Sequence, residues 1–124
     1  MKINIKFGSH TCTAIINDTT TGRLIYDALP IKGRVSRWGR EIYFPIPVDT
    51  GLEAGASDVV SIGSLGYWPT GQAFCIFFGR TPISQGDEIR AASAVNVFGR
   101  VESGIDMLDH VEDGAEVTIE KMAG

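Results

Sequence analysis

The sequence has few cysteines and no long hydrophobic run. Its two cysteines, Cys12 and Cys75, form no CxxC motif and no paired framework, so free thiols in a reducing compartment are expected. No apolar stretch approaches the roughly 20 residues that a membrane-spanning helix needs. Residues 1–7 alternate polar and apolar side chains and lack the hydrophobic block of a signal peptide. We therefore expect a cytoplasmic protein that does not enter a membrane.

Clustered positive charge is also missing. Eleven Lys and Arg residues against fifteen Asp and Glu residues give a net charge of −4, and only Arg34, Arg37 and Arg40 lie close together. A phosphate backbone attracts clustered basic residues, so no nucleic-acid partner is expected. The two cysteines and two histidines lack the spacing of zinc ligands, and the glycines of 51–66 match neither the P-loop nor the dinucleotide-binding pattern. No metal and no cofactor are expected.

The composition is that of an ordinary globular protein, with 44% hydrophobic and 21% charged residues over 124 positions. This length favours a single domain, 1–124, with a buried core. Apolar residues at a period of two predict seven or eight strands, at 2–7, 11–16, 34–38, 41–46, 59–62, 73–78, 94–101 and 115–119. Helical spacing predicts two short helices, over 20–29 and 103–110. So many strands in a short chain favour a barrel or a sandwich, because both reduce the number of exposed edges.

Two of the predicted strands have informative faces. One places Ile42 and Phe44 on one face and Glu41 and Tyr43 on the other. The strand predicted at 73–78 is the most hydrophobic segment of the chain and is apolar on both faces, which is typical of a central strand covered on both sides.

Two segments carry a resemblance to a known family. They are YWPTGQAFCIFFGRTP at 67–82 and WGREIYF at 38–44. Together they resemble the small prokaryotic cyclophilin-like proteins of unassigned function, and the order of the predicted elements fits this family along nearly the whole chain. The resemblance implies a mainly β fold, namely a closed cyclophilin-like barrel of about eight strands with two short helices.

A more distant resemblance is to the true cyclophilins, which are peptidyl-prolyl cis-trans isomerases. Gln72, followed two residues later by Phe74, resembles their pocket glutamine and phenylalanine. Such an enzyme holds the proline ring in an apolar pocket, and an arginine donates a hydrogen bond that favours the twisted amide. In this chain Gln72 and Phe74 match two members of that set. Arg37 or Arg40 would stand in for the arginine, although its spacing to the following aromatics does not match, so the catalytic residues of an isomerase would be Arg37, Gln72 and Phe74. However, Val95 stands where cyclophilins have a pocket histidine, and no tryptophan follows Trp68, so a degenerate isomerase is an alternative hypothesis.

The interpretation that we favour is a binding domain. Large amphipathic rings near turns give ligand pockets contact area and a polar edge, and both Trp38 and Trp68 adjoin turn residues, although a structural role is equally open. Arg37 and Glu41 either form an exposed ion pair, worth under about 1 kcal/mol, or anchor a polar group of the ligand. The predicted pocket, for a small metabolite or a short proline-containing peptide, consists of Arg37, Trp38, Glu41, Tyr43, Tyr67, Trp68, Gln72 and Phe74. A third hypothesis is an interaction or homo-oligomerisation module with Tyr67 and Trp68 in a protein interface.

Overall fold

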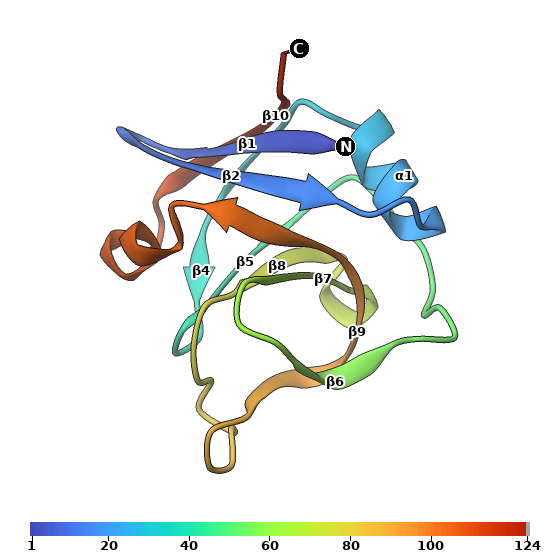
Figure 1. Cartoon of the computed structure of the whole chain (residues 1–124), viewed down its shortest axis with the longest axis vertical. Coiled ribbons are helices and arrows are strands. Elements are labelled where there is room, and N and C mark those ends of the chain that lie inside the picture. The colour runs from blue at the N-terminus through green and yellow to red at the C-terminus, as the bar shows by residue number, and fades with distance from the viewer. Residues whose placement is uncertain (124) are drawn as a thin grey trace.

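A computed structural model describes residues 1–123 and has a mainly β fold (Figure 1). The strands are β1 (Lys2–Phe7), β2 (His10–Ile16), β3 (Ile31–Arg34), β4 (Ser36–Arg37), β5 (Glu41–Pro45), β6 (Ser57–Val60), β7 (Ser64–Trp68), β8 (Ala73–Phe77), β9 (Ile89–Ser103) and β10 (Glu116–Lys121). The helices are α1 (Thr20–Asp27) and the 3-10 helices η1 (Pro69–Gly71) and η2 (Ile105–His110). The mainly β class and the two predicted short helices, now α1 and η2, are confirmed. Among the described residues, no helix is long and apolar enough to cross a membrane.

The strands form one antiparallel sheet in the order β3-β10-β1-β2-β9-β7-β8-β5-β4, and β6 pairs with β9. The two ends of this order are consecutive parts of the chain, because only Val35 separates β3 from β4. The predicted strand at 34–38 is therefore two short strands, of which β3 pairs with β10 and β4 with β5. No ladder of hydrogen bonds joins β3 to β4 within residues 1–123, so the closed barrel is not confirmed. The sheet instead curls until the segment 31–37 spans both of its edges.

The main core fills the inside of this curled sheet. Alternate residues of the strands point inward, as a half-buried strand requires, and α1 covers one end with its fully buried Ile25. The helix begins at Thr20 because the Thr19 hydroxyl accepts a hydrogen bond from the Gly22 N–H (3.0 Å) and so caps its first turn. Fully buried members of the core include Ile3, Ile5, Ile42, Phe44, Phe74, Ile76, Phe98 and Ile119.

Strand β8 is central and buried along its whole length, as its sequence predicts. Phe74 and Ile76 face the main core, while Cys75 and Phe77 face a second, smaller cluster on the outside of the sheet. The first half of β9 covers this outer face. Its last residues pair with β2 and β7, but its first residues pair with β6 instead, so the 15-residue strand bends away from the main sheet (Figure 1).

Two strand predictions missed this region. Residues 64–68, which resemble a glycine-rich turn, form β7, and β9 begins at Ile89 instead of 94. The glycine that makes residues 64–68 resemble a turn is Gly66, which is buried in β7 against its neighbours. A Cβ atom there would meet Val95 at 2.9 Å and Phe77 at 3.1 Å. The glycine allows a close approach between neighbouring segments and does not mark a turn.

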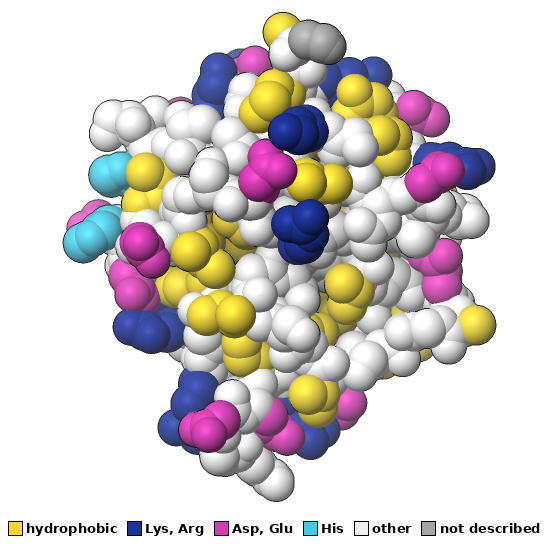
Figure 2. Space-filling model, in the orientation of Figure 1, with side chains coloured by type: hydrophobic (Ala, Val, Ile, Leu, Met, Phe, Trp, Pro, Cys, Tyr) yellow, Lys and Arg dark blue, Asp and Glu magenta, His cyan; other side chains and the backbone are white. Residues whose placement is uncertain are grey.

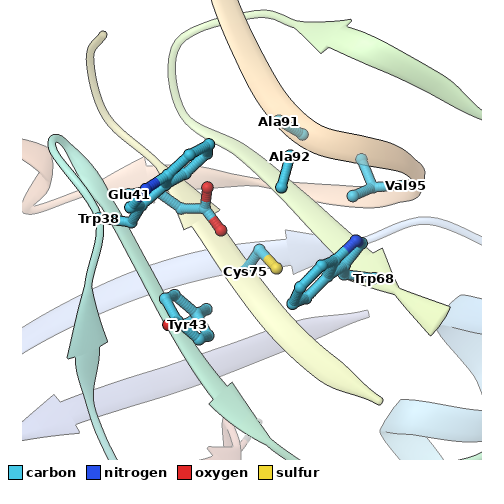
Figure 3. A pocket seen from close by; sticks show the side chains of 8 residues that line it. All are labelled: Trp38, Glu41, Tyr43, Trp68, Cys75, Ala91, Ala92 and Val95. Atoms are coloured by element: carbon cyan, nitrogen blue, oxygen red, sulfur yellow. The ribbon is translucent and has the colours of Figure 1, made fainter. Parts of the chain in front are cut away.

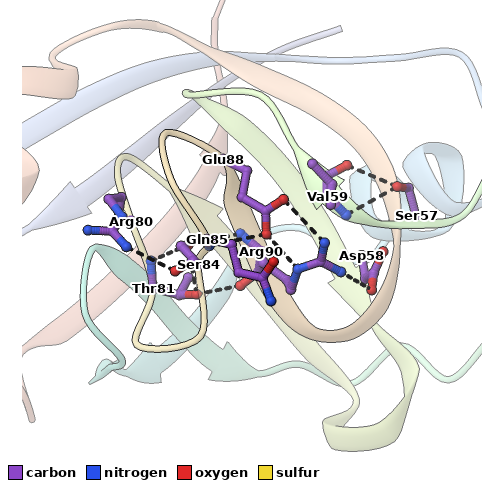
Figure 4. A network of polar contacts seen from close by, with 9 residues as sticks. All are labelled: Ser57, Asp58, Val59, Arg80, Thr81, Ser84, Gln85, Glu88 and Arg90. Carbon is purple, nitrogen blue, oxygen red and sulfur yellow. Dashed lines mark hydrogen bonds and ion pairs between the residues drawn. The ribbon is translucent and has the colours of Figure 1, made fainter.

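A polar network fastens the start of β9 (Figure 4). The Ser84 hydroxyl accepts hydrogen bonds from the backbone N–H groups of Thr81 (3.0 Å) and Arg90 (3.1 Å). The Arg90 guanidinium pairs with Glu88 (2.6 Å) and with Asp58 on β6 (2.8 Å). These contacts hold the loop before β9 and strand β6 together, and they fix the segment that covers the outer face of β8.

Basic and acidic side chains alternate over the face of the molecule in Figure 2, without a continuous patch of one sign. Several exposed pairs link different strands, for example Lys6 on β1 with Glu120 on the adjacent β10 (3.4 Å), and Lys2 on β1 with Glu102 on β9 (3.4 Å), across β2. Each such pair contributes little to stability, because both partners are well solvated.

Candidate functional site

A cavity of about 280 Å³ lies on the outer face of β5, β7 and β8, opposite the main core (Figure 3). We call it the outer pocket. It is lined by Trp38, Glu41, Tyr43, Trp68, Cys75, Ala91, Ala92 and Val95. Large rings form its sides, whereas small residues of β8 and β9 form its floor and roof. A cavity arises here because Cys75 and the two alanines leave space that the rings around them do not fill.

Trp38 and Glu41 meet because they bracket a tight turn. Each donates its backbone N–H to the carbonyl of the other, over 3.0 and 3.2 Å. Gly39 between them has a φ of +62°, and a Cβ atom there would lie 2.9 Å from the Arg80 carbonyl oxygen, so this position requires glycine. The turn thus presents an indole and a carboxyl side by side at the start of β5.

Trp68 is held from two sides. Its indole N–H donates a hydrogen bond to the Ser93 hydroxyl on β9 (2.6 Å), and its ring meets the Tyr43 ring edge to face, with centroids 6.3 Å apart. The ring also lies directly against Gly71 of η1, where a Cβ atom would approach it to 2.6 Å. The side of the pocket that Trp68 forms is therefore fixed before any ligand arrives.

Glu41 is the unusual group of the outer pocket. Its side chain points toward the middle of the cavity (Figure 3), it is only 5% exposed, and its Oε1 atom has no hydrogen-bond partner among the described residues. Burial raises the pKa of Glu41 to about 7, although a hydrogen bond with Cys75 opposes the rise. Burial, together with the nearby negative charge of Glu41, raises the pKa of the Cys75 thiol well above its ordinary value. Near neutral pH the pocket therefore offers a neutral thiol and a carboxyl group that both accepts and donates hydrogen bonds.

Four of the eight residues predicted for the pocket line this cavity: Trp38, Glu41, Tyr43 and Trp68. Arg37 lies elsewhere. Its guanidinium donates to the carbonyl oxygens of Asp109 (2.9 Å) and Val111 (3.0 Å) and lies over the Phe78 ring, 5.2 Å from the centroid. It therefore fastens η2 to the sheet and forms no pair with Glu41.

The side chains of the other three predicted residues are buried in the interior or hydrogen-bonded to backbone carbonyl groups. Tyr67 is fully buried and donates its hydroxyl to the Val48 carbonyl oxygen (2.6 Å). Phe74 is fully buried in the main core, against Phe44 and Phe98. The Gln72 amide donates to a backbone carbonyl oxygen 3.0 Å away, at Ile46. Gln72 ends η1 in a left-handed conformation, φ +50°, so the strand alternation begins only after it. As a result, Arg37, Gln72 and Phe74, the residues that an isomerase would use, do not share a pocket.

Sequence reasoning missed Cys75, Ala91, Ala92 and Val95. Cys75 was expected as a free thiol, and it lies within the strand predicted at 73–78. The three residues of β9 carry no chemical signal of their own. They become part of the site only because β9 bends over the outer face of β8, a long-range arrangement that no local pattern encodes.

The chain belongs to the cyclophilin-like family, whose model matches residues 1–120, and this confirms the expected family. The structure is similar to the solution structure of the hypothetical protein AF2241 from Archaeoglobus fulgidus, with a TM-score of 0.83 and 43% identity over 98% of this chain and 95% of that one. It also shares its fold with McbB in complex with tryptophan, with a TM-score of 0.74 and 15% identity over 98% of this chain but 45% of McbB. Comparison with curated proteins gives no match.

Proposed function

We propose that this cyclophilin-like protein binds a small, largely apolar molecule in the outer pocket, with Glu41 as the polar anchor. One observation carries the proposal: a carboxyl group that is 5% exposed points into an aromatic cavity with one oxygen unpartnered. A buried polar atom without a partner costs roughly 1–3 kcal/mol, and more if it is charged. A ligand group that bonds to this oxygen removes that cost, while the rings gain apolar contact.

The size of the outer pocket limits the ligand. At roughly 30 Å³ for each molecule of liquid water, 280 Å³ corresponds to about nine waters. This volume suits one ring with a short chain, or a single side chain of a peptide. McbB, which shares the fold, is known in complex with tryptophan, so amino acids with aromatic side chains belong in the first set of compounds to test.

The arrangement of the side chains favours a binding domain over the two alternatives, a degenerate isomerase and an interaction or homo-oligomerisation module. No arginine lines the outer pocket, and Arg37, Gln72 and Phe74 are engaged in three separate places, so the hydrogen-bond donor of an isomerase is missing there. A protease-coupled assay on proline tetrapeptides is expected to give no rate above background. Tyr67 is fully buried and therefore does not contribute to a protein interface of the folded chain.

The chain contains two tryptophans, and both line the outer pocket. Tryptophan fluorescence, excited at a wavelength where the ligand does not absorb, therefore reports directly on occupancy. We expect at least one small aromatic or alicyclic metabolite to change this fluorescence saturably and to raise the melting temperature. Ala92→Phe places a ring in the mouth of the cavity and should abolish both effects. Val97→Phe is the matched control, because Val97 lies on the same strand, is 38% exposed and does not line the cavity. Saturable binding that Ala92→Phe leaves intact would mean that the site lies elsewhere.

A further inference from the structure

The charges around Glu41 indicate which class of ligand the outer pocket takes. Only two other titratable side chains line the cavity, Cys75 from β8 and Tyr43 from β5. The residues contributed by β7 and by β9 are Trp68, Ala91, Ala92 and Val95, none of which carries a charge. Glu41 thus supplies the single carboxyl group of the lining, which contains no Lys, Arg or His.

The arginines that adjoin the lining residues in sequence are engaged by other groups. Arg40 pairs with Asp109 (3.0 Å), Arg90 pairs with Glu88 and Asp58, and Arg37 bonds to the backbone of η2. Within residues 1–123, no Lys, Arg or His lies within 4.0 Å of the Glu41 carboxylate. The counter-ion that a buried carboxylate requires is therefore not supplied by the described part of the protein.

Three aromatic rings surround this carboxyl. The face of an indole or phenol ring attracts a cation, and Trp gives the strongest attraction. An anionic ligand would be repelled by Glu41, and a neutral one would leave the carboxylate without a counter-ion. An ammonium group with at least one N–H suits both the unpaired carboxyl and the aromatic rings, because it donates a hydrogen bond to the free Oε1 atom and its positive charge lies against the rings.

We propose that the outer pocket binds a small organic amine as its ammonium ion, with Glu41 as the counter-ion and Trp38, Tyr43 and Trp68 as the surrounding rings. This inference rests on the proposed binding function and adds the charge of the ligand to it. A ring-sized apolar body with a one- or two-carbon arm to the nitrogen matches the volume of the cavity.

Binding of such a cation is coupled to the ionisation of Glu41. The pKa of Glu41 is about 7 in the free protein, whereas an alkylammonium group, like that of Lys, loses its proton only near pH 10. Below pH 7 the carboxyl must release a proton before it pairs with the cation. Affinity should therefore rise up to about tenfold per pH unit as the pH approaches 7 and become constant above about pH 8. Proton release at pH 6 appears as a dependence of the binding enthalpy on the buffer.

The experiment compares 2-phenylethylamine with 2-phenylethanol, which has the same ring and chain but a hydroxyl in place of the ammonium. Calorimetry and tryptophan fluorescence are used on the full chain at pH 5.5 and pH 8. At pH 8 we expect the amine to bind about tenfold to a hundredfold more tightly, the range for a charge-assisted hydrogen bond. This preference should nearly vanish at pH 5.5, and in Glu41→Gln it should vanish at both pH values. Glu120→Gln is the matched control. It removes one negative charge from an exposed position of β10 and should keep the preference.

The outcomes separate this inference from the proposed function. If the alcohol binds the wild type as tightly as the amine and Ala92→Phe abolishes both, the pocket is a binding site but the ammonium proposal is wrong. If Glu41→Gln and Ala92→Phe both bind the amine as tightly as the wild type does, the site of the amine lies elsewhere and both proposals fail. Absence of saturable binding by 2-phenylethylamine and by the shorter benzylamine at millimolar concentration also overturns the ammonium proposal. The pH dependence in the wild type tests the proposal independently of how well Glu41→Gln folds.

Discussion

Replacement of Glu41 by Gln should change how the stability of the free protein depends on pH. The pKa of Glu41 rises from 4.5 to about 7 on folding. Below pH 4.5 the carboxyl is protonated in both the folded and the unfolded chain, so the contribution of this group to stability is then at its maximum. Between pH 4.5 and 7 the unfolded chain loses this proton while the folded chain keeps it, and the free energy of unfolding falls as the pH rises. Above pH 7 the full cost is present, about 3 kcal/mol.

Gln has nearly the shape of Glu and does not titrate. The difference in unfolding free energy between Glu41→Gln and wild type should therefore move by about 2.5 kcal/mol in favour of the variant between pH 5 and pH 8. Between pH 5 and pH 8 the difference in melting temperature should likewise move by about 10 °C in favour of the variant, given roughly 4 °C per kcal/mol for a protein of this size. All other titrating groups cancel in the difference.

The assay is urea unfolding of both proteins at pH 5, 6, 7 and 8, extrapolated to water. Glu120→Gln serves as the control, because it loses an exposed ion pair with Lys6 and should stay within about 0.5 kcal/mol of wild type. If the difference between Glu41→Gln and wild type is the same at pH 5 and at pH 8, the carboxyl is not buried and unpaired as described, and the reasoning is refuted.

Three further predictions concern the groups that build the site and the fold around it. Gly71→Ala brings a Cβ atom to 2.6 Å from the Trp68 ring, so we expect altered tryptophan fluorescence and a loss of about 1–3 kcal/mol in urea unfolding, whereas Gly55→Ala, in open space, should leave both nearly unchanged. Asn96→Ala removes a 3% exposed side chain that bonds to the Glu53 N–H, the Thr21 hydroxyl and the Gly51 carbonyl; this should cost about 2–4 kcal/mol, and an unchanged urea midpoint would contradict it. Burial raises the pKa of Cys12 to about 11 and that of Cys75 well above the ordinary value, so at pH 8 both thiols should react with a disulfide reagent far more slowly in the native protein than in denaturant.

Local patterns in the sequence predicted several parts of this structure correctly. The period of two at β5 places Ile42 and Phe44 in the main core and Glu41 and Tyr43 on the outer face, as observed. The apolar residues on both faces of β8 predict a strand covered from both sides. This prediction was correct, because such a strand is stable only where both of its faces are buried.

The part of the site around Gln72 could not be predicted because of one residue. The predicted pocket includes both Gln72 and Phe74, which lie two residues apart and would share one face if both belonged to a regular strand. In the structure Gln72 belongs to the left-handed end of η1, and it is Cys75 that lines the cavity, while Phe74 faces the core. The alternation of β8 begins only after Gln72, and nothing in the sequence marks this non-glycine residue as left-handed.

The free energy that Glu41 costs the folded protein is also what makes the outer pocket selective. An unpaired carboxylate weakens the fold by about 3 kcal/mol above pH 7, and an ammonium ligand that pairs with it offsets this cost, whereas a neutral ligand of the same shape does not. The stabilisation by an amine should therefore be largest at the pH where the free protein is least stable. In Glu41→Gln both effects should disappear together, because they have the same origin. A variant that gained stability at pH 8 but kept its preference for the amine would show that the cation is held by other groups.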